Sequence, residues 1–295
     1  MSYGLIYLSY PRGQFWFEKG KTDIKKVGDT MRNRALKTLV FCVGVSTFWA
    51  LCGTAWGNLK SGLVAHWTFD EGTGTIAYDS VGNNHGTIHG NALWTTGQVG
   101  NALEFDGFND YVSVQNSPAL NIMGDITIST WVYFDRGGTG QNGSEQAIVT
   151  KCVSNGARNN PFDFRTDIAY DPQLTLVRAD ASAHDYVYST KHISINQWHH
   201  VVAIVENNIP DFYVDGVITS KTVDAFTRTP TGNTYPLLIG RRDDGLYFNG
   251  KIDDVRIYNR ALAAPEVWQL YTIPEPTTIL LLGLGSLSLL RKRKS

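Results

Sequence analysis

The sequence predicts an all-β domain built as a two-sheet antiparallel β-sandwich. From Gly62 onward, apolar and polar residues alternate with a period of two in many short runs, which is the pattern of half-buried strands. Turn-forming residues separate the runs, and only one short segment has helical character. About ten short strands with negligible helix are typical of two packed antiparallel sheets.

The expected strands can be given in chain order. They are residues 63–69, 102–105, 111–114, 126–134, 147–151, 174–177, 199–205, 211–218, 237–240 and 252–258. Asp215-Gly216 predicts a two-residue hairpin turn inside the eighth run. A short helix is expected over 265–270, because proline is favoured in the first turn of a helix. The Gly-rich stretch 136–146 and the stretch 155–163 are expected to be irregular.

The N-terminal part has the order of a secretory signal peptide over residues 31–57. Basic residues follow Met31, an apolar helix-length run covers 39–51, and Ala55-x-Gly57 supplies small residues for cleavage after Gly57. Signal peptidase is therefore an expected partner during export. Residues 1–30 precede this signal, so either translation begins at Met31 or an unstructured extension precedes the signal.

The C-terminal residues 274–295 combine three features in a fixed order. Pro274-Glu275-Pro276 is followed by an apolar run over 277–290 and by four basic residues before Ser295. As a helix the run spans roughly 21 Å, short of a bilayer core of roughly 30 Å. The arrangement resembles a PEP-CTERM sorting signal. The resemblance implies transient membrane attachment and cleavage near the Pro-Glu-Pro triplet by an exosortase-type protease.

Between the two signals, residues 58–273 carry a net negative charge. This segment has 14 Lys and Arg against 23 Asp and Glu, a net charge of −9. That balance argues against nucleic acid, which requires a basic surface. It is compatible with divalent-cation binding or with an ordinary solvated surface. Cys152 is the one cysteine of the segment, which excludes an internal disulfide there.

Residues 58–273 also resemble a laminin-G-like domain of the concanavalin A-like lectin/glucanase superfamily. The resemblance rests on "GLVAHWTFDEGTGTIAYDS", "GNALEFDGFNDYVSV", "WHHVVAIV", "FYVDGV" and "FNGKIDDVRIYNRAL", which occur in the expected order and cover Gly62 to Tyr271. It implies a jelly-roll sandwich. It is much less specific for function, because sites vary on a common fold.

The resemblance further implies a structural calcium ion where the first and last strands meet. This points to Asp70, Asp79 and Asn83 from the opening segment and to Asp253 from the closing one. Calcium binds carboxylate, amide and carbonyl oxygens, which such turns supply. The alternative is ordinary turn and capping chemistry, which favours the same residues.

Aromatic side chains in or near loops are the candidates for stacking on sugar rings. They are Trp94, Tyr170, Tyr186 and Tyr188, with Phe162 and Tyr247 as further candidates. Alternatively, these side chains merely cover the edges of the sheets. Trp67, Trp131 and Trp198 lie on alternating strands and are expected in the core.

The sequence offers little for catalysis. Residues 58–273 hold five Glu, none in the Glu-x-Asp-x-x-Glu arrangement of the superfamily's glucanases, and no Gly-x-Ser-x-Gly motif. His85 and His89 lie in a segment that is not helical, and the adjacent His199 and His200 face opposite sides of a strand, so zinc is not expected. We expect an exported, non-catalytic protein of the bacterial envelope or extracellular matrix that binds a polysaccharide or glycoconjugate or acts in adhesion. The alternatives are a structural matrix protein without a ligand site and a glycoside hydrolase.

Overall fold

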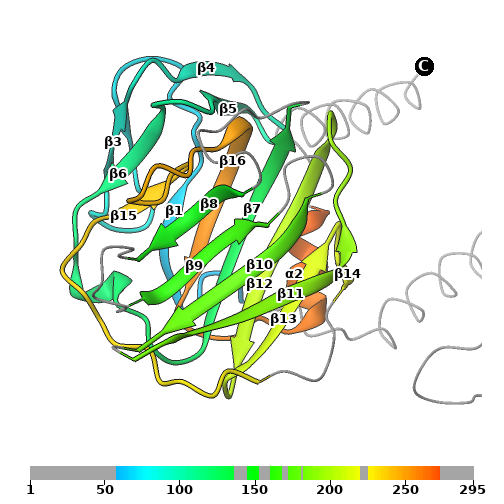
Figure 1. Cartoon of the computed structure of the whole chain (residues 1–295). Coiled ribbons are helices and arrows are strands. Elements are labelled where there is room, and N and C mark those ends of the chain that lie inside the picture. Colours follow the sequence, from blue (N-terminus) through cyan, green and yellow to red (C-terminus); the bar gives the residue numbers. More distant parts are fainter. Residues whose placement is uncertain are drawn as a thin grey trace, which may run out of the picture. The chain divides into compact units, whose positions relative to one another are not determined.

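The computed structural model describes residues 58–135, 145–152, 160–167, 172–180, 182–219 and 225–272. Within these residues the chain forms two eight-stranded antiparallel sheets that pack face to face. Figure 1 shows one sheet in front of the other, and we name them the front sheet and the back sheet. The predicted two-sheet sandwich is confirmed.

The strand bounds are as follows. The back sheet contains β1 (Leu63–Trp67), β4 (Leu93–Thr96), β5 (Asn101–Asp106), β7 (Ile126–Phe134), β12 (Trp198–Glu206), β13 (Ile209–Val214), β14 (Val217–Ile218) and β16 (Asn249–Tyr258). The front sheet contains β2 (Ile76–Ala77), β3 (Gly86–His89), β6 (Tyr111–Val114), β8 (Gln146–Lys151), β9 (Asn160–Thr166), β10 (Gln173–Ala179), β11 (His184–His192) and β15 (Leu237–Ile239). A short 3₁₀ helix, η1 (Pro118–Leu120), and the helix α2 (Ala264–Tyr271) complete the described elements.

The order of the strands brings the two ends of the domain together. The back sheet runs β14-β13-β12-β7-β16-β5-β4, with β1 paired to β16 as well, and the front sheet runs β11-β10-β9-β8-β15-β6-β3-β2. Along one side of β16, residues 249–252 pair with β5 and residues 255–258 pair with β1. The register against β7 shifts between Asp253 and Arg256, and Asp254 has a φ of 53° at this bulge. The bulge sets the directions of Asp253 and Asp254.

The main core fills the space between the sheets. Trp67, Phe164 and Phe212 are fully buried there, and the rings of Phe164 on β9 and Phe212 on β13 stack across the two sheets at 6.5 Å. The prediction of an irregular stretch over 155–163 is wrong for residues 160–163, which begin β9. Phe162 consequently lies in the core with no exposed surface, so it is not a loop aromatic.

The other tryptophans that were expected in the core lie at its margins. Trp131 is buried, but its ring stacks on Tyr271 of α2 at 5.7 Å, on the outer face of the back sheet. Trp198 is only half-buried and meets Tyr133 edge-on at 5.8 Å. The core expectation therefore holds in full for Trp67 and only in part for the other two.

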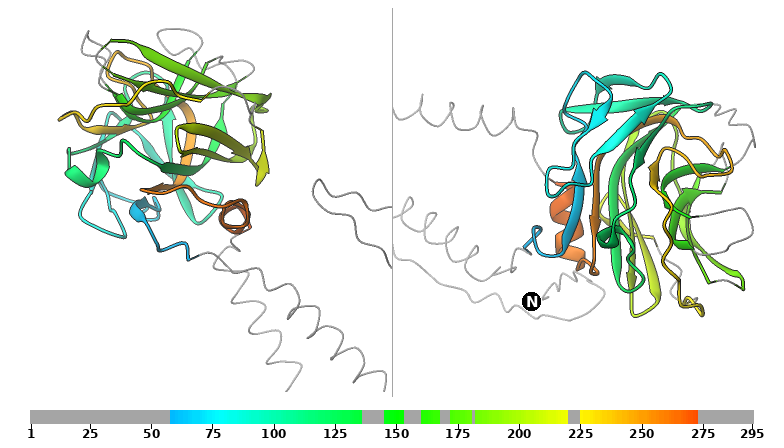
Figure 2. Two further views of the ribbon diagram at one scale, coloured as in Figure 1. Left: turned by 90° about the horizontal axis from the view of Figure 1, so that it is seen from below. Right: turned by 90° about the vertical axis from the view of Figure 1, so that its left-hand side faces the viewer.

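Helix α2 confirms the helix expected over 265–270. Figure 2 (right) shows it on the side of the back sheet that faces away from the front sheet. Val267 and Leu270 pack there against outward-facing residues of the back sheet, among them Val202 and Tyr258, in a second apolar cluster. Within the described residues, no helix is long and apolar enough to cross a membrane. Both apolar clusters and their packed neighbours lie between Leu59 and Leu270, so we expect residues 58–273 to fold as one unit.

Candidate functional site

A small charged cavity opens on the outer face of the front sheet, over strands β8 to β11. Its volume is about 230 Å³, and we name it the charged pocket. It is lined by Cys152, Asn160, Asp163, Arg165, Val177, His184, Tyr186, Arg242 and Asp244. Because residues i and i+2 of a strand share a face, Asp163 and Arg165 point outward into this pocket while Phe162 and Phe164 point into the core.

Asp163 is the most deeply buried charged group of the pocket. Its side chain is 2% exposed, and its Oδ2 lies 3.1 Å from Nη1 of Arg165 and 3.5 Å from Nη1 of Arg242. Within the described residues no donor reaches its other oxygen, Oδ1. Burial raises the pKa of Asp163 to about 7, with nearby carboxylates adding to the rise and Arg242 opposing it. A buried oxygen without a donor is costly, so this atom is suited to accept a hydrogen bond from a ligand.

Two arginines hold the carboxylates of the pocket in place. Nη1 of Arg165 lies 3.3 Å from Oε2 of Glu145, and Nη2 of Arg242 lies 2.5 Å from Oδ2 of Asp244. Burial alone would lower the pKa of Arg242, but its hydrogen bond to Asp244 and the charge of Asp163 raise it. Burial raises the pKa of Glu145, and Arg242 opposes that shift. The ion pairs therefore hold the donors and acceptors of the pocket in fixed positions.

Tyr186 and Tyr188 form an aromatic edge beside the charged groups. Both were expected in or near loops, but they lie on strand β11 and remain 46% and 42% exposed. Tyr186 lines the charged pocket, and the guanidinium of Arg165 lies 5.7 Å from its ring centroid. An exposed ring that is held beside hydrogen-bonding groups is the combination that sugar stacking requires.

Two of the other aromatic candidates, Trp94 and Tyr247, lie away from the charged pocket. Trp94 lies on β4 in the back sheet, packs against the main core and donates its indole N–H to the carbonyl oxygen of Gly74 at 3.1 Å. Tyr247 lies beside Arg241, whose guanidinium is 5.2 Å from its ring centroid. Tyr170 lies outside the described residues.

Two of the four expected calcium ligands, Asp79 and Asn83, lie at a different turn from Asp70 and Asp253. Asp79 accepts backbone hydrogen bonds from His66 and Val81 at 3.0 Å and from Asn84 at 3.1 Å. Burial alone would raise the pKa of Asp79, but these bonds outweigh it and lower the pKa. Asn83 is exposed next to this turn. Asp79 therefore serves a turn, which is the alternative that the sequence left open.

Asp70 and Asp253 lie on either side of the turn at Gly97–Gly100. Oδ1 of Asp70 accepts the N–H of Asn101 at 2.9 Å, and Oδ2 of Asp253 accepts the N–H of Val99 at 2.8 Å. A Cβ at Gly100 would lie 2.1 Å from Oδ1 of Asp70, so a side chain at this position would displace the carboxylate.

Oδ1 of Asp253 is buried, and no described residue donates to it. Burial raises the pKa of Asp253 to about 8, and the carboxylates of Asp254 and Asp70 add to the rise. This orphaned carboxylate oxygen fits a hard cation, although the described residues hold no group of three or more His, Cys, Asp or Glu placed for a metal ion.

A chain of three hydrogen-bonding side chains was not foreseen from the sequence. Nε2 of His199 lies 2.8 Å from Oγ of Ser194, and Nδ1 lies 2.8 Å from Oδ2 of Asp215. These spacings match a nucleophile–base–acid relay. However, the amide nitrogen of Gln197 is also 3.0 Å from Nε2, and Oδ1 of Asp215 accepts the backbone N–H of His200. We interpret the chain as a tie between the loop before β12 and the hairpin at Asp215-Gly216.

Comparisons with known proteins agree with this architecture. Residues 105–268 match the Laminin G 3 family model, which is described as concanavalin A-like lectin/glucanases superfamily. The chain belongs to that superfamily. Residues 272–294 of this laminin-G-like protein match the PEP-CTERM protein-sorting motif, which indicates export and membrane-associated sorting. The motif residues Pro274, Glu275 and Pro276, like Ala55 and Gly57 at the expected signal cleavage site, lie outside the described residues.

Solved structures share the fold of the laminin-G-like domain at low identity. Domain 4 of an extracellular arabinanase from Geobacillus stearothermophilus, solved with arabinotriose, has 23% identity and a TM-score of 0.56, with 72% of this chain and 99% of that chain covered. The binding domain of Paraclostridial Mosquitocidal Protein 1 has 19% identity and a TM-score of 0.55, with coverage of 72% and 52%. A sialidase of Trypanosoma rangeli has 17% identity and a TM-score of 0.52, with coverage of 71% and 32%. The chain thus spans only about half of the mosquitocidal protein's chain and about a third of the sialidase chain. At these identities the matches show the fold alone.

The burial of Asp163 predicts a specific pH dependence of stability. Its pKa is raised from 3.8 to about 7, so folding favours the protonated carboxyl, and this contribution is complete below about pH 4 and lost as the pH rises to about 7. In Asp163→Asn the side chain cannot ionise. The wild type loses this contribution between about pH 4 and about pH 7, and the variant does not. The difference in free energy of unfolding, variant minus wild type, should therefore increase over that range by on the order of 4 kcal/mol at most. Urea unfolding at a series of pH values measures the difference. A constant offset between the two proteins over that range would contradict the prediction.

Proposed function

We propose that this protein is exported and binds carbohydrate without cleaving it, and that the charged pocket is its binding site. The observation that carries the proposal is the buried Oδ1 of Asp163, which no described residue donates to, inside a cavity edged by the exposed ring of Tyr186. Sugar hydroxyls are donors as well as acceptors. One sugar can therefore donate a hydrogen bond to Asp163 and also accept hydrogen bonds from the arginines.

Each group of the charged pocket has a part in this binding mode. Oδ1 of Asp163 accepts a sugar hydroxyl, and the guanidinium groups of Arg165 and Arg242 donate to ring or hydroxyl oxygens. The face of Tyr186 packs against the apolar face of the sugar ring. The cavity of about 230 Å³ suits one sugar unit or the end of a chain rather than a long segment. The similarity to a domain that was solved with arabinotriose supports a saccharide as the ligand.

A glycoside hydrolase is the alternative that one observation favours. Glu145 and Asp163 approach the same arginine and both have raised pKa values, as a catalytic acid does. We prefer binding, because Oδ2 of Asp163 is engaged by two arginines. If the protein is a hydrolase, it should release reducing sugar from a polysaccharide, and a single substitution such as Glu145→Gln should abolish this release.

The binding proposal predicts a selective loss of affinity in two variants. In Asp163→Asn the acceptor is weakened, and in Tyr186→Ala the stacking ring is lost, so each should weaken binding of a short oligosaccharide about 10- to 100-fold. Isothermal titration of residues 58–273 with arabinotriose and a panel of other trisaccharides measures the affinity.

Phe108→Ala is the matched control for this experiment. Phe108 is an exposed aromatic, at 51%, in the loop between β5 and β6. Its variant should bind like the wild type, and Phe108→Ala and Tyr186→Ala should melt at temperatures close to that of the wild type. Absence of binding across the panel would instead favour a structural matrix protein without a dedicated ligand site.

We also propose that calcium binds between Asp70 and Asp253 and stabilises the domain. Oδ1 of Asp253 and the second oxygen of Asp70 are the expected protein ligands, and the cation would neutralise two neighbouring carboxylates. Its role is to tie the Gly97–Gly100 turn to the bulge in β16.

Calcium should therefore raise the melting temperature of the wild type after chelation, and it should raise that of Asp253→Asn much less. Differential scanning calorimetry with and without calcium provides the measurement. Asp211→Asn on β13 is the control and should keep the full response. The idea fails if chelation leaves the wild-type melting temperature unchanged.

The two terminal signals determine the form in which the domain works. We propose that the secreted protein begins after Gly57 and loses its basic tail near the Pro-Glu-Pro triplet, to reside in the envelope or the matrix around it. Intact-mass spectrometry of protein isolated from the producing cells should show neither Met31 nor Arg291–Ser295. A secreted species that retains the basic residues would contradict removal of the tail.

A further inference from the structure

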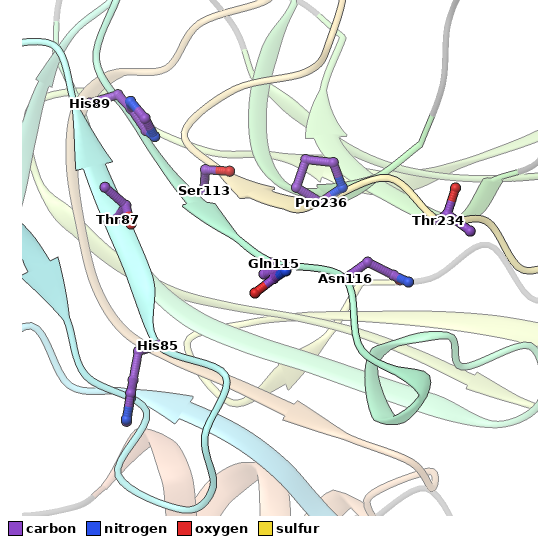
Figure 3. A pocket seen from close by; sticks show the side chains of 8 residues that line it. All are labelled: His85, Thr87, His89, Ser113, Gln115, Asn116, Thr234 and Pro236. Atoms are coloured by element: carbon purple, nitrogen blue, oxygen red, sulfur yellow. The ribbon is translucent and has the colours of Figure 1, made fainter.

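A second hollow lies on the outer face of the front sheet, over β3, β6 and the start of β15. It is an open groove of about 640 Å³, and we name it the polar groove. Figure 3 shows its lining side chains: His85, Thr87, His89, Ser113, Gln115, Asn116, Thr234 and Pro236. Ile88, Val112 and Val114 of the same strands pack into the core, so Thr87 and Ser113 point outward into the groove. The strand order places the charged pocket over the other half of this sheet.

The histidines of the polar groove are fixed in orientation. Nδ1 of His85 accepts the backbone N–H of Asp79 at 3.0 Å, which leaves Nε2 as the protonated nitrogen of the neutral ring. His89 stacks on Tyr111, its partner across the strands, at 4.5 Å with the rings 11° from parallel. The guanidinium of Arg241 lies 4.6 Å from the ring centroid of Tyr111, which extends the stack.

Asn116 is fixed at the opposite end of the lining. Its Oδ1 accepts hydrogen bonds from Nζ of Lys151 at 2.8 Å and from the amide of Asn121 at 3.1 Å. Lys151 is fully buried and also donates to the carbonyl oxygen of Tyr235 at 2.7 Å, beside Thr234 and Pro236 of the groove. With its oxygen engaged twice, Asn116 has its Nδ2 group left as the donor toward a ligand. A buried lysine thus fixes two parts of the groove at once.

We infer that the polar groove is a second carbohydrate site, which takes an internal stretch of a neutral polysaccharide chain. Its lining offers hydroxyl, amide and imidazole groups and includes neither carboxylate nor guanidinium, which suits uncharged hydroxyl-rich ligands. The groove has more than twice the volume of the charged pocket, and its open form admits several consecutive sugar units. Because the side chains of His85, His89 and Asn116 are already held in place, binding restricts little of their freedom. This inference does not depend on the charged pocket being a sugar site.

Blocking the groove with a large side chain tests the inference. Thr87 is exposed on β3, so Thr87→Trp should fill the groove without entering the core. Thr96→Trp is the matched control, since Thr96 is an exposed strand residue on β4 of the back sheet. Affinity electrophoresis of residues 58–273 in gels that contain linear arabinan, galactomannan, hydroxyethylcellulose or the acidic polymer polygalacturonate measures retardation.

The expected result is retardation by at least one neutral polymer, at least ten-fold weaker in Thr87→Trp and unchanged in Thr96→Trp. Equal retardation of both tryptophan variants would overturn the groove as the site. So would loss of retardation in Tyr186→Ala but not in Thr87→Trp, which would move polymer binding to the charged pocket. Retardation by polygalacturonate alone, or by no polymer, also overturns it. The trisaccharide titrations judge the charged pocket separately, and Thr87→Trp should leave them unchanged.

Discussion

Strand β16 is the element on which the rest of the fold depends, because it pairs with three strands from distant parts of the chain. It contacts β7 along one side and both β5 and β1 along the other. The bulge at Asp253 and Asp254 lies between the segment of β16 that pairs with β5 and the segment that pairs with β1. The bulge turns Asp253 toward the Gly97–Gly100 turn and Asp254 toward His66 of β1, whose Nε2 lies 2.6 Å from Oδ1 of Asp254. The opening and closing segments of the domain are thereby joined by carboxylates as well as by the strand ladder.

Most of the fold could be predicted from local alternation, and the failures have a physical cause. Alternation identifies a strand when one face is apolar and the other polar, as in β7 and β16. Strand β11 places Tyr186 and Tyr188 on its outer face and Val187 inside, so both faces look apolar and the strand was missed. Strand β9 is buried on both faces, because Asp163 and Arg165 lie inside the charged pocket, and it follows a run of asparagines that suggests a loop.

The candidate sites were less predictable, because they are assembled across strands. The charged pocket combines β9, β10, β11 and the turn at Arg242–Asp244, and no spacing in the sequence links these segments. Tyr186 could be named in advance because it is an aromatic residue outside the expected strands, where a ring can be exposed. Asp163 could not, since its significance lies in burial that only the fold creates. Asp70 and Asp253, by contrast, were selected together by the family resemblance, and the structure places both at one turn. Asp79, which was selected with them, bonds to a different turn.

The two outer faces of the sandwich have different roles. On the back sheet, α2 covers outward-facing apolar residues such as Val202 and Tyr258, so that face is occupied by the protein itself. On the front sheet, the outer face carries both hollows and no described helix covers it (Figure 2). Helix α2 ends at Tyr271, and the match to the sorting motif begins at residue 272. The described chain therefore ends on the outer side of the back sheet, opposite the face with the polar groove and the charged pocket. Under the proposed function, this uncovered face is the one that meets polysaccharide.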